Sequence, residues 1–286
     1  MFLQRKREQA DVRMTDIPIP AWAESGPSNE PISLVFLHGI GGGKKGFQPS
    51  LDFFSKQGYR ALAWDMPGYG ESALCEPFDF PILAQALESM LNAAHVQQAV
   101  LIGHSMGAMG AVQAWTHCPQ RSAALVLAAS SPAFGNNSGE FQQQFMAQRL
   151  APLDAGQSMA QVADRLIPGM VAPGALPAGA KAADYPPGLA LAHACMSAVP
   201  AQTYRAALKA LVTFEQRAAL PSLSVPTLCL AGEVDRTAPP EVMRRMAEKI
   251  PHAEFESLPG TGHLMGFEQP ELFHAAVLNF LSRKVQ

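Results

Sequence analysis

Short apolar runs alternate along most of the chain with longer stretches in which apolar residues recur every three or four positions. Uninterrupted apolar runs of strand length are typical of strands buried on both faces of a sheet. Apolar runs predict strands at Ser33–Gly39, Arg60–Asp65, Ala99–Ser105, Ala123–Ser130 and Thr227–Asp235, and the last strand is predicted at Glu254–Gly260. Helices are predicted at Phe47–Gln57, Phe80–His95, Met106–Cys118, Glu241–Ile250 and Pro270–Leu281. Strands that alternate with helices indicate an α/β fold with a mostly parallel, doubly wound sheet.

Two segments depart from this alternation. The proline-rich residues before Ser33 predict edge strands and turns. The interval 131–222 has no run of the buried-strand type, and its helical stretches are joined by a loop rich in Pro, Gly and Ala. We therefore predict a core domain formed by 1–130 and 223–286, with a helical lid inserted at 131–222. Such a lid lies over the carboxyl end of the sheet, where open α/β sheets bind ligands.

Composition narrows the protein class. The chain has 286 residues, of which 48% are hydrophobic, enough for one large core. The formal net charge is −3 with no strong bias of either sign, which predicts no nucleic-acid or membrane partner. The four cysteines have no metal-ligand spacing, and the first residues lack the pattern of a secretory signal. We expect a cytoplasmic monomer or homodimer with free thiols, no metal and no cofactor.

Ser105 stands at the junction of a predicted strand and a predicted helix, in VLIGHSMGAMG (100–110). Gly103 and Gly107 remove the Cβ atoms that would clash in a sharp turn, and the small residues after them let the helix approach the sheet. This setting predicts a nucleophile elbow. The alternative is a glycine-flanked turn whose serine has no chemical role.

A serine nucleophile needs a base and a group that orients the base. His263 is the best base, because it lies in a loop just after a predicted strand. Asp235, after the preceding strand, is the predicted orienting acid, and Glu233 is the second candidate. The strand that ends at Ser130 offers no carboxylate there. The sequence thus predicts a Ser105–His263–Asp235 triad.

The glycine-rich run HGIGGGKKG (38–46) predicts an oxyanion hole, because glycines let backbone N–H groups approach one point. We assign the N–H groups of Ile40 and Met106, with Gly41 as the alternative to Ile40. No GKS or GKT follows, so a phosphate loop is disfavoured. His38 is expected to pack beneath this loop.

The predicted substrate pocket is apolar, and its expected lining includes Phe134, Phe214, Leu264 and Met265. Core packing is the alternative role for the two phenylalanines of the lid. Arg205 and Lys209 lie four residues apart on one predicted helix face, where they could meet a substrate carboxylate. A solvated surface pair is the alternative for them.

The motifs together resemble the α/β-hydrolase fold family over nearly the whole chain. The matching segments are LHGIGGG, WDMPGYGES, GHSMG, GEVDRTAPP and GTGHLMGFEQPE, and the order Ser, Asp, His is that of the family. The chain is most similar to bacterial 3-oxoadipate enol-lactonases and related small serine esterases. It also resembles meta-cleavage product C–C hydrolases, but those usually carry Asn and Trp where this chain has His104 and Leu264.

The triad and the resemblance predict a serine hydrolase that cleaves a small carboxylic ester or lactone through an acyl-enzyme on Ser105. Two alternatives stay open from the sequence. One is a C–C bond hydrolase of ring-fission products. The other is a non-catalytic homologue that binds a ligand or a partner.

Overall fold

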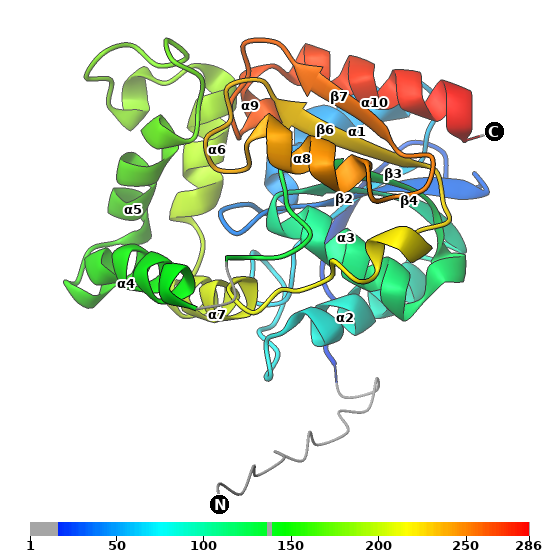
Figure 1. The fold of residues 1–286 in the computed structure, drawn as a ribbon, viewed down its shortest axis with the longest axis horizontal. Helices are drawn as coiled ribbons and strands as arrows, with labels where there is room; N and C mark the ends of the chain where they lie inside the picture. The colour runs from blue at the N-terminus through cyan, green and yellow to red at the C-terminus, as the bar shows by residue number, and fades with distance from the viewer. Residues whose placement is uncertain (1–16, 136–138, 286) are drawn as a thin grey trace, which may run out of the picture.

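The computed structural model describes residues 17–135 and 139–285, and these residues form a seven-stranded sheet with helices on both faces (Figure 1). The sheet order is β1-β3-β2-β4-β5-β6-β7. Only β1 (Trp22–Ser25) is antiparallel to its neighbour, β3 (Ala61–Trp64). The parallel strands besides β3 are β2 (Ile32–Leu37), β4 (Gln98–His104), β5 (Ser122–Ala128), β6 (Thr227–Gly232) and β7 (Glu254–Leu258). The predicted mostly parallel sheet is therefore confirmed.

The two faces of the sheet pack against different helices. One face packs against α2 (Phe80–Ala93), α3 (Met106–His117) and α8 (Pro240–Ala247). The other packs against α1 (Gln48–Lys56) and α10 (Pro270–Lys284). Side chains along β2 alternate between these two cores, as the strand period of two requires. Helices on both faces explain why the strands read as continuous apolar runs.

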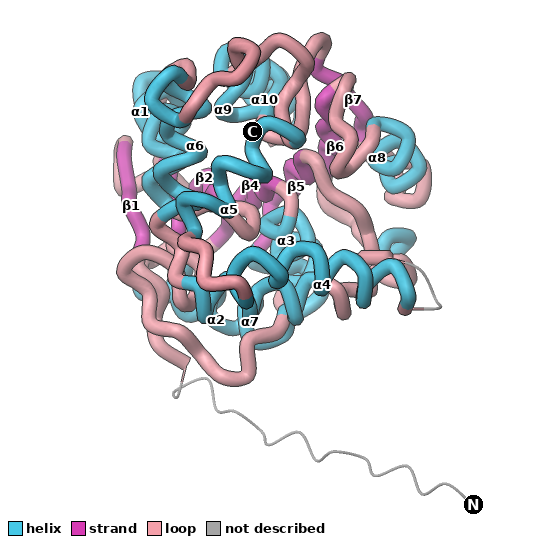
Figure 2. Tube along the Cα trace, turned by 90° about the vertical axis from the view of Figure 1, so that its left-hand side faces the viewer, coloured by secondary structure: helices cyan, strands magenta, loops and turns pink. Residues whose placement is uncertain are grey.

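Four helices fill the interval between β5 and β6, and we call them the cap. They are α4 (Glu140–Asp154), α5 (Met159–Leu166), α6 (Pro187–Ser197) and α7 (Ala201–Leu211). Figure 2 shows α5 and α6 lying over one end of the sheet, with α4 and α7 along its lower side. The division of the chain into a core and a lid at 131–222 stays a prediction. The expectation that the first residues are not a secretory signal concerns residues 1–16, which lie outside the described residues.

The stretch TYRAALKALVTFEQRAAL (203–220) has the pattern of one long helix, but only its first half, within α7, is helical. The chain leaves α7 at Leu211, and Ala133 and Glu215 then form an isolated antiparallel bridge. The N–H of Phe134 donates to the carbonyl of Phe214 at 3.0 Å. The two connections between the core and the cap thus lie side by side, and this tertiary pairing overrides the local helical pattern.

The sequence pattern also missed a short helix, α9 (Met265–Glu268), directly after His263. Its four residues are too few to produce a helical period. In the part of the chain that the structure describes, no helix is long and apolar enough to cross a membrane.

Candidate active site

Ser105 occupies a strained turn between β4 and α3. Its φ is 55° and its ψ is −118°, a conformation that costs a non-glycine residue energy and that must be held by its surroundings. The Ser105 N–H donates to the carbonyl of Ala128 at 2.8 Å. The Ser105 carbonyl accepts from the N–H of Ala108 at 3.0 Å and from the hydroxyl of Ser130, also at 3.0 Å. These contacts hold the turn on the end of β5.

Two glycines make this turn possible. A Cβ atom on Gly107 would lie 2.0 Å from the carbonyl oxygen of Leu37, and one on Gly103 would lie 2.4 Å from Cα of Ala108. Both contacts are with backbone atoms, which cannot move away as a flexible side chain can. The glycines therefore let α3 begin directly against the ends of β2 and β4, as the sequence predicted.

His263 and Asp235 form a buried pair. Nδ1 of His263 lies 2.8 Å from Oδ2 of Asp235, and the two side chains are 3% and 0% exposed. The other oxygen of Asp235 accepts from the N–H groups of Thr237 and Ala238, at 2.7 and 3.0 Å. The carboxylate is thus held in one orientation, and its partner Nδ1 must carry the proton. This leaves Nε2 of His263 as the acceptor.

The second candidate acid lies elsewhere. The carboxylate of Glu233 is exposed and accepts from the N–H of Gly260 at 2.8 Å. It closes the turn after β7 and does not contact His263 in the described structure. The geometry therefore favours Asp235.

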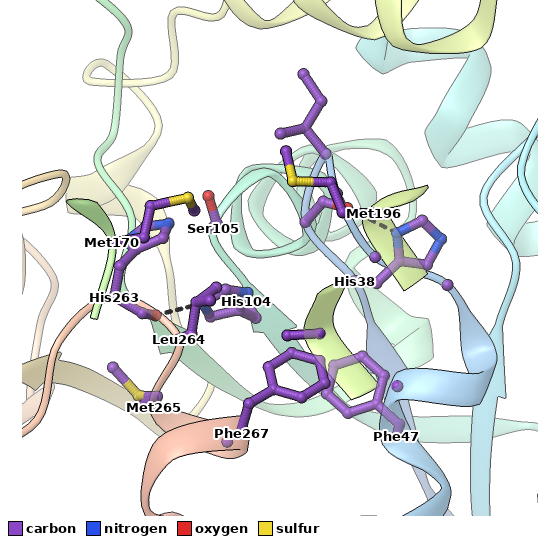
Figure 3. A pocket seen from close by; sticks show the side chains of 18 of the residues that line it. His38, Phe47, His104, Ser105, Met170, Met196, His263, Leu264, Met265 and Phe267 are labelled. Atoms are coloured by element: carbon purple, nitrogen blue, oxygen red, sulfur yellow. Dashed lines mark hydrogen bonds between the residues drawn. The ribbon is translucent and has the colours of Figure 1, made fainter. Parts of the chain in front are cut away.

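Ser105 and His263 line one cavity, together with His38 and His104. Figure 3 shows Ser105 beside the His263 ring, with the Met170 side chain next to both residues. No hydrogen bond joins the Ser105 hydroxyl to the His263 ring in the described part of the chain. Catalytic hydrogen bonds are often long without a bound substrate, so this spacing is compatible with a base role for His263.

The loop that carries His263 is fixed by three groups whose role the sequence did not reveal. The Glu268 carboxylate accepts from the N–H of Gly262 and of Leu264, each at 3.1 Å, and from that of Ala172 at 2.7 Å. Burial raises the pKa of the Glu268 carboxyl, and the three N–H donors act in the opposite direction. Glu268 therefore ties the residues on both sides of His263 to the cap.

The two other groups contact the His263 backbone. Its N–H donates to the carbonyl of Met170 at 2.7 Å, and its carbonyl lies 2.7 Å from Nε2 of His104. That carbonyl can only accept, so Nε2 of His104 carries the proton. Burial lowers the pKa of His104 to about 4, which keeps this tautomer neutral near pH 7. Contacts made across the fold leave no signal in a single sequence.

The N–H groups of the two predicted oxyanion donors have no protein acceptor in the described structure. Gly42 donates to the carbonyl of Gly39 at 2.9 Å and closes a turn around Ile40 and Gly41. The N–H of Met106 is the first of α3 and has no partner within the helix. Among the described residues, neither the Ile40 nor the Met106 N–H donates to another protein group. Gly41 stays the alternative to Ile40.

His38 supports this turn from below, as expected. Its Nε2 accepts from the N–H of Met66 at 2.9 Å, so its Nδ1–H donates to the carbonyl of Gly39 at 2.8 Å. A Cβ atom on Gly42 would lie 2.5 Å from Cβ of His38, which shows how closely the turn packs on the ring. Burial lowers the pKa of His38 to about 4, so the ring is neutral near pH 7.

Lys44 follows the glycine-rich turn and is buried against Asp65. Its Nζ lies 2.6 Å from Oδ2 of Asp65, its N–H donates to Oδ1 at 2.8 Å, and its Nζ also pairs with Glu71. The two carboxylates thus neutralise the charge of Lys44. This pairing fits a structural role and does not fit a phosphate site.

The cavity has a volume of about 820 Å³, its open mouth included, and is mostly apolar. Leu264 and Met265 line it, as predicted. The two cap phenylalanines are not among the lining residues of this cavity. Phe134 packs against Phe145 at a ring distance of 4.8 Å, and Phe214 packs against Phe80 at 4.5 Å. Both rings pack in or against the hydrophobic core between the cap and the sheet.

Arg205 and Lys209 do not line the cavity either. Nη1 of Arg205 lies 2.6 Å from Oδ1 of Asp154, and both side chains are partly or largely exposed. The expectation that these cations meet a substrate carboxylate is therefore wrong for this cavity.

Several relatives are similar over nearly the full length of the chain. A provisionally named carbamate hydrolase of Variovorax paradoxus is 28% identical over 253 residues, 88% of this chain and 92% of the relative. A 3-oxoadipate enol-lactonase of Acinetobacter baylyi is 26% identical and covers 87% and 88%. A 2-hydroxy-6-oxononadienedioate/2-hydroxy-6-oxononatrienedioate hydrolase of a Pseudomonas species has the same identity and coverage.

Solved structures agree with these relatives. A hydrolase from Pseudomonas aeruginosa superimposes with a TM-score of 0.80 at 26% identity, covering 92% of this chain and 94% of the other. The sequence profile of the α/β hydrolase fold matches residues 32–270, which include the strands β2 to β7 and the residues Ser105, Asp235 and His263. The chain belongs to the α/β hydrolase family and is a hydrolase.

Proposed function

We propose that this hydrolase cleaves a carboxylic ester or lactone through an acyl-enzyme on Ser105. One observation carries the proposal. The strained Ser105 turn opens into the same cavity as a histidine whose Nδ1 is held at 2.8 Å by Asp235. A hydroxyl held on an elbow beside an oriented imidazole is the arrangement that makes serine a nucleophile.

Each group has a role in this mechanism. Nε2 of His263 takes the proton of Ser105 as the hydroxyl attacks the carbonyl carbon. Asp235 keeps the ring in the required tautomer and stabilises the imidazolium. The N–H groups of Met106 and Ile40 receive the developing oxyanion. His263 then protonates the leaving oxygen. In the second half of the reaction a water molecule attacks the acyl-enzyme while His263 takes its proton. His263 returns this proton to the Ser105 oxygen as the acid product leaves.

Labelling with a fluorophosphonate tests the nucleophile. The wild-type protein should lose its p-nitrophenyl acetate hydrolysis in step with covalent labelling, and a peptide map should place the label on Ser105. The Ser105→Ala variant should fold normally, take up no label and lose at least a thousandfold in kcat. Turnover near the wild-type rate in a folded Ser105→Ala protein would refute the proposal.

Hydrolysis of a C–C bond is the second use of the same triad, since one relative is named for it. That reaction requires an additional proton transfer to a dienol before the acyl step. Leu264 follows the histidine here, and its side chain cannot donate a hydrogen bond. We therefore expect kcat/KM for a short-chain ester or lactone to exceed that for a 2-hydroxy-6-oxodienoate at least tenfold. A faster rate on the dienoate would change the reaction type and leave the triad in place.

A further inference from the structure

The cavity around Ser105 is lined without a charged side chain. The lining residues are glycines, aliphatic residues, methionines, phenylalanines, a few histidines and two serines. No Lys, Arg, Asp or Glu is among the described lining residues. The nearest cations in the sequence, Lys44 and Lys45, are not among these lining residues, and Lys45 is exposed to solvent. Lys44 is bound to Asp65 and Glu71, and Arg205 is paired with Asp154.

The polar atoms that do line the cavity are mostly used by the protein. Both ring nitrogens of His38 have backbone partners, and the hydroxyl of Ser50 lies 2.9 Å from Nε2 of His274. His104 uses Nε2 for the carbonyl of His263. Burial lowers the pKa of His38 and of His104 to about 4, so neither ring brings a positive charge to the cavity near pH 7.

The part of the cavity away from Ser105 is aromatic. Figure 3 shows Phe47 and Phe267 side by side there, separated from Ser105 by His104 and Leu264. A Cβ atom on Gly46 would lie 3.0 Å from Cζ of Phe267, so the wall is closely packed at this point. We call this part, formed by Phe47, Phe267 and Met265, the aromatic end.

We infer that the substrate is uncharged in the group that occupies the aromatic end, and that the enzyme rejects esters that carry a carboxylate there. This inference rests on the proposed esterase function and narrows its substrate class. A carboxylate moved from water into an apolar cavity loses its hydration, and no cation among the described lining residues replaces it. An alkyl or aryl group gains by the same transfer. The cavity therefore separates neutral from anionic esters by desolvation alone.

Two matched pairs of esters test this inference. The first is p-nitrophenyl hexanoate against mono-p-nitrophenyl adipate, which have acyl chains of equal length and the same leaving group. The second is phenyl hexanoate against 4-carboxyphenyl hexanoate, which moves the carboxylate to the leaving group. We expect kcat/KM to fall at least 30-fold with the carboxylate in at least one pair. The methyl ester of the adipate, which is neutral, should recover most of the loss.

A smaller fall in both pairs would overturn the inference while leaving the proposed function intact. A failure of the function would look different, because Ser105→Ala would then hydrolyse the neutral esters as fast as the wild type. The two failures are therefore distinguishable in the same set of assays.

Phe267 offers a gain-of-function test. Its side chain is only partly buried, so a lysine there can keep its ammonium hydrated. Phe267→Lys should reduce the preference for the neutral member of the discriminating pair at least tenfold, whereas Phe267→Leu should keep it. An unchanged preference in Phe267→Lys, with circular dichroism showing a native fold, would show that the aromatic end does not hold the group in question.

Discussion

Nδ1 of His263 lies 2.8 Å from Oδ2 of Asp235, with both side chains almost fully buried. Asp235→Asn retains the shape of the acid but offers an amide that can present an N–H to the ring, which favours the wrong tautomer. We expect kcat to fall by about 10³ to 10⁴ with little change in KM. Steady-state kinetics on p-nitrophenyl acetate measures both constants.

Glu233→Gln is the matched control for this change. Glu233 is exposed and closes a turn, so its kcat should stay within about twofold of the wild type. If Glu233→Gln were the crippling variant and Asp235→Asn the mild one, the assignment of the acid would be reversed.

Glu268 should contribute to both stability and activity. Its two oxygens accept three backbone N–H groups, and a glutamine side chain has only one oxygen for them. Glu268→Gln should lower the free energy of unfolding by about 1–3 kcal/mol, because at least one buried N–H is left without an acceptor. Urea denaturation measures this loss.

The position of Glu268 also connects it with His263. We expect kcat of Glu268→Gln to fall more than KM rises, because the loop on both sides of the base loosens while the lining of the cavity is kept. A variant with wild-type stability and wild-type kcat would show that these hydrogen bonds do not hold the loop.

Gly107 and Gly110 lie in the same helix, and replacing each by alanine should change the free energy of unfolding in opposite directions. A Cβ atom on Gly107 meets the Leu37 carbonyl oxygen at 2.0 Å, whereas one on Gly110 meets no atom within 4 Å. Gly107→Ala should cost more than about 3 kcal/mol or prevent folding, because backbone must move. Gly110→Ala should stabilise the protein by about 0.5–1 kcal/mol. Urea unfolding of both variants decides, and equal effects would contradict the close approach of α3.

Acid should destabilise the fold through His38. Burial lowers its pKa to about 4 in the folded protein, whereas the ordinary value for histidine is about 6.5. Between these values the unfolded chain binds a proton that the folded chain does not, so stability is complete above pH 6.5 and is lost as the pH falls towards 4. From pH 7 to pH 5, His38 alone should contribute a loss of about 2 kcal/mol.

The comparison with His38→Gln isolates this contribution. Glutamine has a donor and an acceptor but no titration in this range. The variant should therefore show a shallower decrease of unfolding free energy between pH 7 and pH 5, whatever its stability at pH 7. Parallel pH profiles of the two proteins would mean that His38 does not carry the effect.

Local pattern was sufficient for much of this molecule. The five buried strands, the edge strand β7, the elbow around Ser105 and the glycines beside it were predictable because strand period, turn sterics and chain order are properties of neighbouring residues. The loop position of His263 followed from the rule that site residues come after strand ends, whereas that rule fits Asp235 and Glu233 equally, since both follow β6.

Tertiary packing decided what lies between segments that are far apart in the chain. Phe134 and Phe214 have the composition of a pocket wall, but Phe214 is buried against Phe80 and Phe134 packs, partly buried, against Phe145, so neither ring lines the cavity around Ser105. Arg205 was a candidate for a substrate carboxylate until Asp154, 51 positions earlier, proved to be its partner. The side chains of Glu268 and Ser130 form hydrogen bonds with backbone groups of the site. Every residue carries such backbone groups, so no sequence pattern marks these contacts. Sequence therefore determined which residues can do chemistry, and packing determined which of them share a cavity, because burial and charge pairing depend on neighbours in space.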